Sequence, residues 1–184
     1  MAAKISATLG IIRAMDADES VELWVPLAPV PKGNSQRVVR RGRFTRVLPS
    51  ARAESAQRAL ANYLRRSAPA SPPTGPVRRD ATYWLPVPKS WPKWKRDAAR
   101  DGRYLPPGGG RQPDTGNFDK LLDDALEAAG WVANDGQIVG GHTAKLYAPL
   151  EPGYSIRITP LEQATRSSPG HRYDPPVRRY RATP

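Results

Sequence analysis

The amino-acid sequence predicts one α/β (α+β) domain in which two main helices alternate with about four strands. Their expected order is strand, helix, strand, helix, strand, strand. Apolar residues alternate with polar ones in the strand segments and recur at helical spacing in residues 50–66 and 118–129. The length of 184 residues suits one domain with tails. Hydrophobic residues make up 39% of the chain, which indicates a folded core, whereas 21 prolines indicate irregular segments.

The first strand is expected in "VELWVPLAPVPKG", which begins at Val21 and runs into prolines that end the alternation. Residues 1–20 before it are expected to be a flexible segment. A basic run without acids follows, and such a run is more often solvated or phosphate-facing than packed. Its members are Lys32, Arg37, Arg40, Arg41, Arg43 and Arg46.

A helix is expected in "SARAESAQRALANYLRR", residues 50–66, because alanines and leucines recur there at helical spacing. Ser50 is the expected N-cap, and Arg65 and Arg66 suit the negative end of the helix dipole. After a proline-rich connector at 67–76, "DATYWLPVPKS" predicts a second strand. The tetrapeptide "PVPK" ends both predicted strands, so Lys32 and Lys89 each lie just beyond a strand, where loops often carry function.

Trp91 and Trp94 are interleaved with basic residues in "SWPKWKRDAARDGRYLPPGGGRQ". Aromatic rings among cations can stack on nucleic-acid bases while the charges follow the phosphates. The alternative is that both rings cover the sheet and the charges face water. The sequence favours neither.

The long helix at 118–129 has one continuous apolar face, and Gly130 stands where a C-cap is expected. Two strands then follow, in "GQIVGGHTAKLYAPL" and "GYSIRITPL", and the short link between them predicts an antiparallel hairpin. The domain is expected to span residues 21–161. Residues 162–184 have no periodicity and many arginines, which predicts a disordered basic tail.

The formal net charge of +12 predicts a polyanionic partner, with nucleic acid as the first candidate. A merely soluble basic surface, or a structural protein of the ribosomal kind, is the alternative. There is no cysteine, which excludes disulfides and thiolate metal sites. No apolar run is long enough to span a bilayer and no signal peptide is evident, so we expect an intracellular protein without a membrane partner.

An acidic stretch interrupts this basic chain between Asp114 and Asp135, with six acids against the single base Lys120. Most of these acids have a plain structural explanation. Asp119, Asp123 and Glu127 suit a solvated helix face, and Lys120 with Asp124 suits an i, i+4 ion pair. Asp114 suits a helix cap, and Asp135 suits the turn of a hairpin.

Together, however, one carboxylate precedes the helix and one follows it, so a cation could bring the two into one pocket. Mg²⁺ prefers few carboxylates together with waters and phosphate oxygens, and two protein ligands would suffice for a site that DNA completes.

The segment "PDTGNFDKLLDDALEAAGWVANDGQIV" resembles the signature of the RusA family of Holliday junction resolvases, common in phages and prophages. "PVPKGNSQR" and "LPVPKSWPKWKRDAARDG" resemble phage members of the same family, and the likeness covers roughly residues 21–160. It implies a small mixed α/β domain, a symmetric homodimer and magnesium-dependent incision of four-way DNA junctions. Mn²⁺ would substitute for Mg²⁺, and no small-molecule cofactor is implied.

Carried over by position, the resemblance makes Asp114, Lys120 and Asp135 the catalytic residues, with Asp114 and Asp135 as metal ligands. Two positions depart from the family pattern: Gly116 replaces a metal-binding aspartate, and Asn134 replaces the first acid of a later pair. Gly116 is a natural divergence, a deliberate inactivating change, or a loss for which Asp119 compensates.

The sequence thus predicts a cytoplasmic endodeoxyribonuclease, of a bacterium or a phage-infected host, that acts on four-way junctions in recombination, repair or phage DNA processing. The residues expected to bind DNA are Lys32, Arg37, Lys89, Lys93, Lys95 and Arg96. Two alternatives remain at this stage. One is a junction-binding protein that Gly116 has impaired as a catalyst, and the other is a basic RNA-binding or structural protein.

Overall fold

The computed structural model describes residues 20–33, 36–41, 43–107 and 113–162. Over these residues the predicted α+β order is confirmed, with a third α-helix, a short extra strand and a separate strand pair added to it. The elements in chain order are β1 (Val21–Val25), β2 (Gln36–Arg41), β3 (Phe44–Pro49), α1 (Ala51–Leu64), η1 (Arg65–Ser67), β4 (Val77–Leu85), α2 (Lys93–Arg100), α3 (Thr115–Ala129), η2 (Asp135–Gln137), β5 (Ile138–Gly140), β6 (Thr143–Tyr147) and β7 (Gly153–Pro160). The N-terminal segment predicted to be flexible and the predicted basic tail lie outside the described residues, apart from residues 20 and 162.

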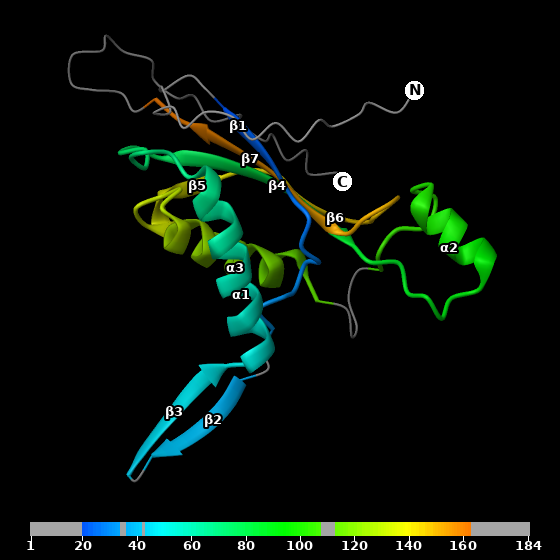
Figure 1. Cartoon of the computed structure of the whole chain (residues 1–184), viewed down its shortest axis with the longest axis horizontal. Coiled ribbons are helices and arrows are strands. Elements are labelled where there is room, and N and C mark those ends of the chain that lie inside the picture. Colours follow the sequence, from blue (N-terminus) through cyan, green and yellow to red (C-terminus); the bar gives the residue numbers. More distant parts are fainter. Residues whose placement is uncertain (1–19, 34–35, 42, 108–112, 163–184) are drawn as a thin grey trace, which may run out of the picture.

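The body of the protein is a mixed five-stranded sheet centred on β4 and β7 (Figure 1). β7 pairs antiparallel with β1 on one side and with β4 on the other. β5 and β6 both pair in parallel with β4, each along a different part of that strand. The two central strands are also the longest and the most buried, as expected for strands with neighbours on both sides.

The predicted antiparallel hairpin of the last two strands is wrong. β6 and β7 lie on opposite sides of β4: Leu85 is level with Tyr147 of β6, and Trp84 is level with Gly153 of β7. The short link between them therefore crosses the end of β4. β7 has mostly buried residues and takes a central position, whereas β6 is largely half-exposed and forms an edge.

Both long helices lie on one face of this sheet, as Figure 1 shows. α1 begins at its predicted cap, because the Ser50 side chain accepts a hydrogen bond from the backbone N–H of Ala53. α3 ends at Gly130, whose φ of 83° lies in the left-handed region that glycine tolerates best. The N-cap of α1 and the C-cap of α3 that the sequence predicts are thus both confirmed.

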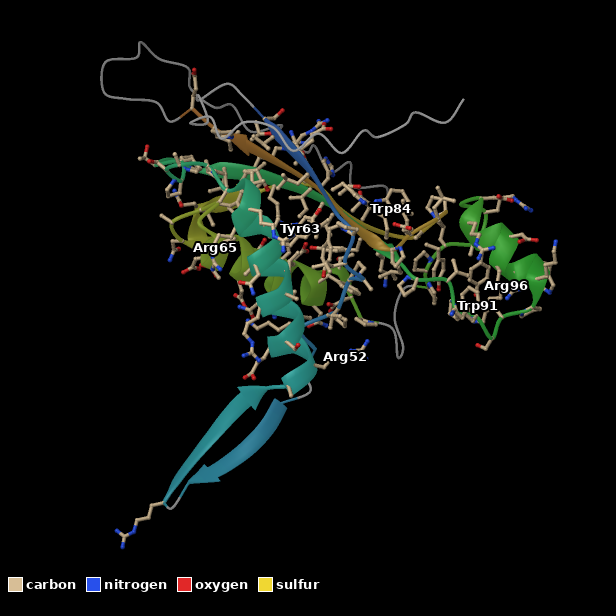
Figure 2. All side chains as sticks on the ribbon, in the orientation of Figure 1. Arg52, Tyr63, Arg65, Trp84, Trp91 and Arg96 are labelled. Atoms are coloured by element: carbon tan, nitrogen blue, oxygen red, sulfur yellow. The ribbon has the colours of Figure 1, made fainter. Side chains whose placement is uncertain are left out.

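Two elements extend away from this body (Figure 1). β2 and β3 form a separate antiparallel ribbon in the basic run, which the sequence predicts only as solvated or phosphate-facing. α2 lies beyond the other end of the sheet, and Figure 2 shows Trp91 and Arg96 with it there. Its eight residues are too few for periodicity to distinguish a helix from a loop in the sequence.

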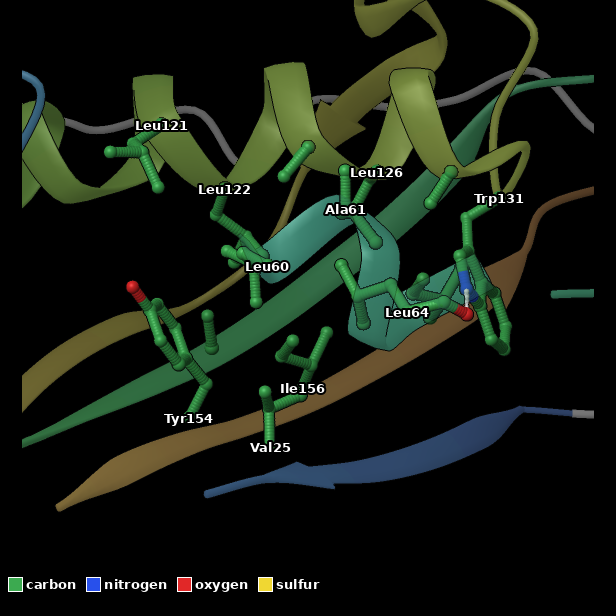
Figure 3. Packing of buried hydrophobic residues seen from close by; sticks show 14 of the residues in the cluster. Val25, Leu60, Ala61, Leu64, Leu121, Leu122, Leu126, Trp131, Tyr154 and Ile156 are labelled. Atoms are coloured by element: carbon green, nitrogen blue, oxygen red, sulfur yellow. Dashed lines mark hydrogen bonds between the residues drawn. The ribbon is translucent and has the colours of Figure 1, made fainter. Parts of the chain in front are cut away.

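The core fills the space between the helices and the sheet. Leucines of α1 and α3 meet Val25, Tyr154 and Ile156 of the sheet there (Figure 3). Trp131, directly after α3, is 1% exposed, and its Nε1 donates a hydrogen bond of 3.0 Å to the carbonyl oxygen of Leu64 at the end of α1. This tryptophan therefore fixes the ends of both helices to each other. Within the described ranges, each helix is too short or too polar to cross a membrane.

Replacing Trp131 should destabilise the whole domain, because it removes a buried ring and leaves a cavity. We expect Trp131→Ala to lower the free energy of unfolding by about 3–5 kcal/mol. Trp131→Phe keeps most of the buried apolar surface but loses the hydrogen bond. The lost hydrogen bond alone should lower the free energy of unfolding by about 1 kcal/mol. Urea denaturation measures both. Leu150→Ala, at a side chain that is 92% exposed, is the control and should change stability by less than about 0.5 kcal/mol.

Candidate functional site

Asp114 is the N-cap of α3, as predicted. Its side chain accepts a hydrogen bond of 2.9 Å from the backbone N–H of Asn117, and the residue is exposed. Gly116 and Lys120 lie on the following turns, four residues apart and therefore on the same side of the helix. Both are exposed as well. The structure thus brings Asp114, Gly116 and Lys120 together at the first turns of α3.

Lys145 of β6 binds the backbone directly before Asp114. Its Nζ donates hydrogen bonds to the carbonyl oxygens of Pro113, at 3.0 Å, and Pro107, at 3.2 Å. Pro107 and Pro113 are therefore both tied to β6. The sequence offered no signal for this role, because a lysine within a half-exposed strand has many ordinary explanations.

Asp135 lies at the other end of α3. It is the first residue of η2, and its backbone N–H donates to the Glu127 carboxylate in the last turns of the helix. The Asp-Gly pair is therefore part of a 3₁₀ turn capped by Asn134 and not the hairpin turn that its sequence suggests. The thirteen residues of helix from Asp114 to Glu127 span about 20 Å at 1.5 Å per residue.

This separation argues against a cation shared by Asp114 and Asp135 within one chain, and their assignment as metal ligands stays a prediction. Carboxylates that bind one Mg²⁺ each approach it to about 2.1 Å. In the described ranges, moreover, no three His, Asp or Glu side chains lie close enough together to hold a metal ion. A magnesium site built from these two aspartates does not fit a single chain.

Two of the three acids predicted to face solvent, Asp119 and Asp123, are half-buried in an ionic cluster between α3 and the sheet, whereas Glu127 is exposed as predicted. Arg79 of β4 is 7% exposed and is paired with Asp119 at 2.8 Å and with Asp123 at 2.9 Å. Tyr83 and Thr143 also donate their hydroxyl protons to Asp119. The prediction of a solvated acidic face fails for Asp119 and Asp123 because it considers α3 without the arginine beneath it.

A signal for this cluster exists in the sequence. β4 alternates inward and outward residues, and Arg79 occupies an inward position between Val77 and Ala81. A charged residue at a core position requires a partner of opposite charge, because an unpaired buried charge is very costly. The acids on α3 provide that partner.

Burial raises the pKa of Asp123 to about 6, with Arg79 opposing the shift and Asp119, Asp124 and Asp135 adding to it. The direction is the expected one because one guanidinium serves two carboxylates. The negative charge of Asp123 is therefore only partly balanced by the charge of Arg79.

Asp119 is not free to replace the missing carboxylate at position 116. Its Oδ1 already accepts hydrogen bonds from Arg79, Tyr83 and Thr143. At Gly116, by contrast, an added Cβ would lie 3.7 Å from Oδ1 of Asp114, an ordinary contact distance. A side chain at position 116 is therefore sterically possible and would point into the neighbourhood of Asp114.

Lys32, predicted to bind DNA, ties the first loop to α3. Its Nζ pairs with Asp124, and its backbone N–H donates to the carbonyl oxygen of Asn117 at 2.8 Å. Asp124 thus has its ion pair with Lys32, where the sequence suggests Lys120. Contact of Lys32 with DNA stays a prediction, with the added cost of breaking this pair.

The predicted DNA-binding residues around α2 differ in how free they are. Lys89 and Lys93 are exposed, and Lys93 makes an i, i+4 pair with Asp97 at 3.1 Å. Lys95 lies over the rings of Trp91 and Tyr104. Arg96 donates to the carbonyl oxygen of Lys89 at 3.2 Å. Arg37 lies in β2, level with Leu48 of β3.

A hollow of about 600 Å³ lies over the uncovered face of the sheet and is unrelated to these residues. Its lining includes Trp24, Asp80, His142 and Arg157, and none of the residues predicted for catalysis or DNA binding. The volume of this hollow is therefore no reason to assign the catalytic site to it.

Fold and surface together define a class of protein: a basic α+β protein with an exposed acid and lysine at a helix start, suited to act on a nucleic-acid backbone. The family model described as endodeoxyribonuclease RusA matches residues 26–159. The chain therefore belongs to the RusA family, whose members are endodeoxyribonucleases that resolve Holliday junctions, as its motifs suggest. A comparison with curated proteins finds no match.

The raised pKa of Asp123 predicts how stability changes with pH. Between the ordinary carboxyl pKa of 3.8 and about 6, the folded protein binds more protons at this residue than the unfolded chain. The contribution of Asp123 to the free energy of unfolding of the wild type is therefore fully present below pH 4, and it is lost as the pH rises through 6. Asp123→Asn lacks the dependence, so its stability relative to wild type should rise by about 1–2 kcal/mol from pH 4 to pH 7, after allowance for solvent screening.

Urea titrations of both proteins at several pH values measure this difference. Asp101→Asn, at an exposed aspartate, is the matched control and should show a much smaller change. A difference between Asp123→Asn and wild type that does not vary with pH would contradict the assignment.

Proposed function

We propose that this protein is a magnesium-dependent endodeoxyribonuclease that resolves four-way DNA junctions by paired, symmetric nicks. The observation that carries the proposal is the RusA family match across residues 26–159, combined with the exposed Asp114 and Lys120 on the first turns of α3. The proposed setting is DNA recombination, repair or phage DNA processing in the cytoplasm of a bacterium or a phage-infected host.

In this proposal the basic segments bind the DNA backbone, and α3 presents its first turns to the phosphate that is cut. Lys120 offsets the negative charge that develops on that phosphate during hydrolysis. Asp114 is held in place by its bond to the helix N-terminus and by the bond from Lys145 to the carbonyl oxygen of the preceding Pro113. Products with a 5′-phosphate and a 3′-hydroxyl are expected.

A cation shared by Asp114 and Asp135 requires two chains, because about 20 Å of helix separates Asp114 from Glu127, the residue that Asp135 contacts in one chain. We therefore propose that the functional unit is a symmetric homodimer in which Asp114 of one subunit meets Asp135 of the partner subunit. A dimer with twofold symmetry contains two copies of such a site. Two equivalent sites match the two symmetric nicks that resolve a junction.

This arrangement predicts complementation between two inactive variants. Asp114→Asn and Asp135→Asn should each lower junction nicking in Mg²⁺ by roughly 100-fold or more. When the two are mixed and allowed to exchange subunits, each mixed dimer regains one intact site. Nicking should then recover to roughly a quarter of the wild-type rate, as single unpaired nicks, because about half of the dimers are mixed.

A labelled four-way junction on denaturing gels gives the readout, and Asp114→Asn carried alone through the same exchange is the control. A mixture as inactive as its components would refute the shared site. A wild-type protein that binds the junction but never nicks it, at any Mg²⁺ or Mn²⁺ concentration, would refute the enzymatic proposal itself.

Gly116 supports a second candidate function, a junction-binding protein impaired in cleavage. Gly116→Asp places a carboxylate beside Asp114 without a clash, so it should tighten Mg²⁺ binding and raise the nicking rate roughly tenfold or more. Gly116→Asn, nearly equal in size but uncharged, is the matched control and should have neither effect. If neither metal affinity nor cleavage changes in Gly116→Asp, the positional assignment of Asp114 and Gly116 is wrong.

A further inference from the structure

Trp91 and Trp94 occur three residues apart, yet the structure gives them opposite environments. The Trp91 ring packs edge-on against Tyr104, at 5.3 Å between centroids, and Tyr147 of β6, at 5.2 Å. Trp94 is 67% exposed, and among the described residues no aromatic or cationic side chain stacks on it. One tryptophan therefore anchors α2 to the sheet, and the other is left free.

The anchor makes α2 a fixed platform. Nζ of Lys95 lies 3.9 Å from the centre of the Trp91 ring and 4.6 Å from that of Tyr104, which places a cation between two aromatic faces. Ala99, one turn further on the same side of the helix, is 1% exposed. Lys95 thus holds the helix in place, and it is less free to contact a phosphate than its charge suggests.

The outward side of α2 combines positive charge with the free ring. Lys93 and Arg100 are seven residues apart, about two turns, so they project from one side of the helix, and both are exposed. Trp94 is displaced from them by about 100°, between this cationic side and the packed side. A strand whose phosphates follow Lys93 and Arg100 would place its bases toward Trp94.

The platform is also connected to the proposed catalytic end of the molecule. Chain continuity leads from α2 to Pro107, and Lys145 binds the carbonyl oxygens of both Pro107 and Pro113, next to Asp114. In Figure 1, α2 extends beyond the end of the sheet at which β6, the strand of Lys145, is labelled. DNA that reaches Asp114 therefore lies on the side of the molecule where α2 projects.

We propose that Trp94 is a base-stacking residue that binds an unstacked DNA base at or beside the branch point, with Lys93 and Arg100 on the adjoining phosphates. An intact duplex keeps its bases stacked and offers no ring face to Trp94, whereas a branched substrate exposes such faces where strands exchange. Stacking on an aromatic side chain needs no particular base, because every base has a π-face. The inference rests on the proposed function, and it adds a residue that selects branched DNA over linear DNA.

The test compares wild type, Trp94→Ala, Trp94→Phe and Val139→Ala, the last at a 60% exposed side chain on β5. Each binds a four-way junction with 2-aminopurine at the branch point, the same junction with the probe inside an arm, and a linear duplex of equal length. Trp94→Ala should bind the junction roughly tenfold more weakly and leave duplex binding unchanged. Trp94→Phe should recover most of the affinity, and Val139→Ala should match wild type.

Two further readouts separate stacking from charge. The fluorescence change of 2-aminopurine at the branch point should be lost in Trp94→Ala, while the probe inside the arm reports no difference. The salt dependence of junction binding should stay the same, because no charge is removed.

Equal junction affinity of Trp94→Ala and wild type would overturn the inference, as would an equal loss on junction and duplex. In either case the wild-type preference for junctions, and hence the proposed function, would stand. A wild-type protein without any preference for the junction would overturn the proposed function and this inference together.

Discussion

The contact on which the site depends is the ionic cluster between Arg79 of β4 and two aspartates of α3. A buried guanidinium that loses its partners costs several kcal/mol, so the pairing with Asp119 and Asp123 stabilises the observed orientation of α3 on the sheet. The positions of the candidate catalytic residues on α3 depend on that orientation. The first turns, with Asp114 and Lys120, stay at the surface because leucines hold the opposite face of the helix against the core and the two aspartates hold one flank of it to Arg79.

The length of α3 then determines how the acids can work. A straight helix of 15 residues separates the groups at its two ends by far more than any metal can bridge. In the proposed function, each chain therefore contributes two half-sites, one at each end of the helix. A twofold axis is the simplest operation that brings unlike ends of two identical helices together, and a four-way junction offers a matching dyad. The geometry of one helix thus links the chemistry to the proposed assembly.

Positive charge in this protein has two uses that its sequence does not distinguish. Lys32, Lys95 and Arg96 are engaged with Asp124, with aromatic rings and with a backbone carbonyl, and so they hold loops and α2 in place. Lys89 and Lys93 are exposed and remain available to a polyanion. The net charge of +12 explains why the protein should attract DNA at all. Which cations reach the phosphates is decided by what each side chain meets in the fold.

The sequence by itself determined the features that depend on neighbours a few residues away. The Ser50 and Asp114 caps, the Gly130 C-cap and the apolar face of α3 follow from local hydrogen bonding and helical periodicity. The motif likewise placed Asp114 and Lys120 at one helix start. Only the tertiary structure decided that β6 pairs in parallel with β4, that Asp119 and Asp123 pair with a buried arginine, and that Asp135 lies against Glu127 at the far end of α3. Those outcomes depend on contacts between residues distant in the chain, and a local pattern carries no information about which distant residue will lie opposite.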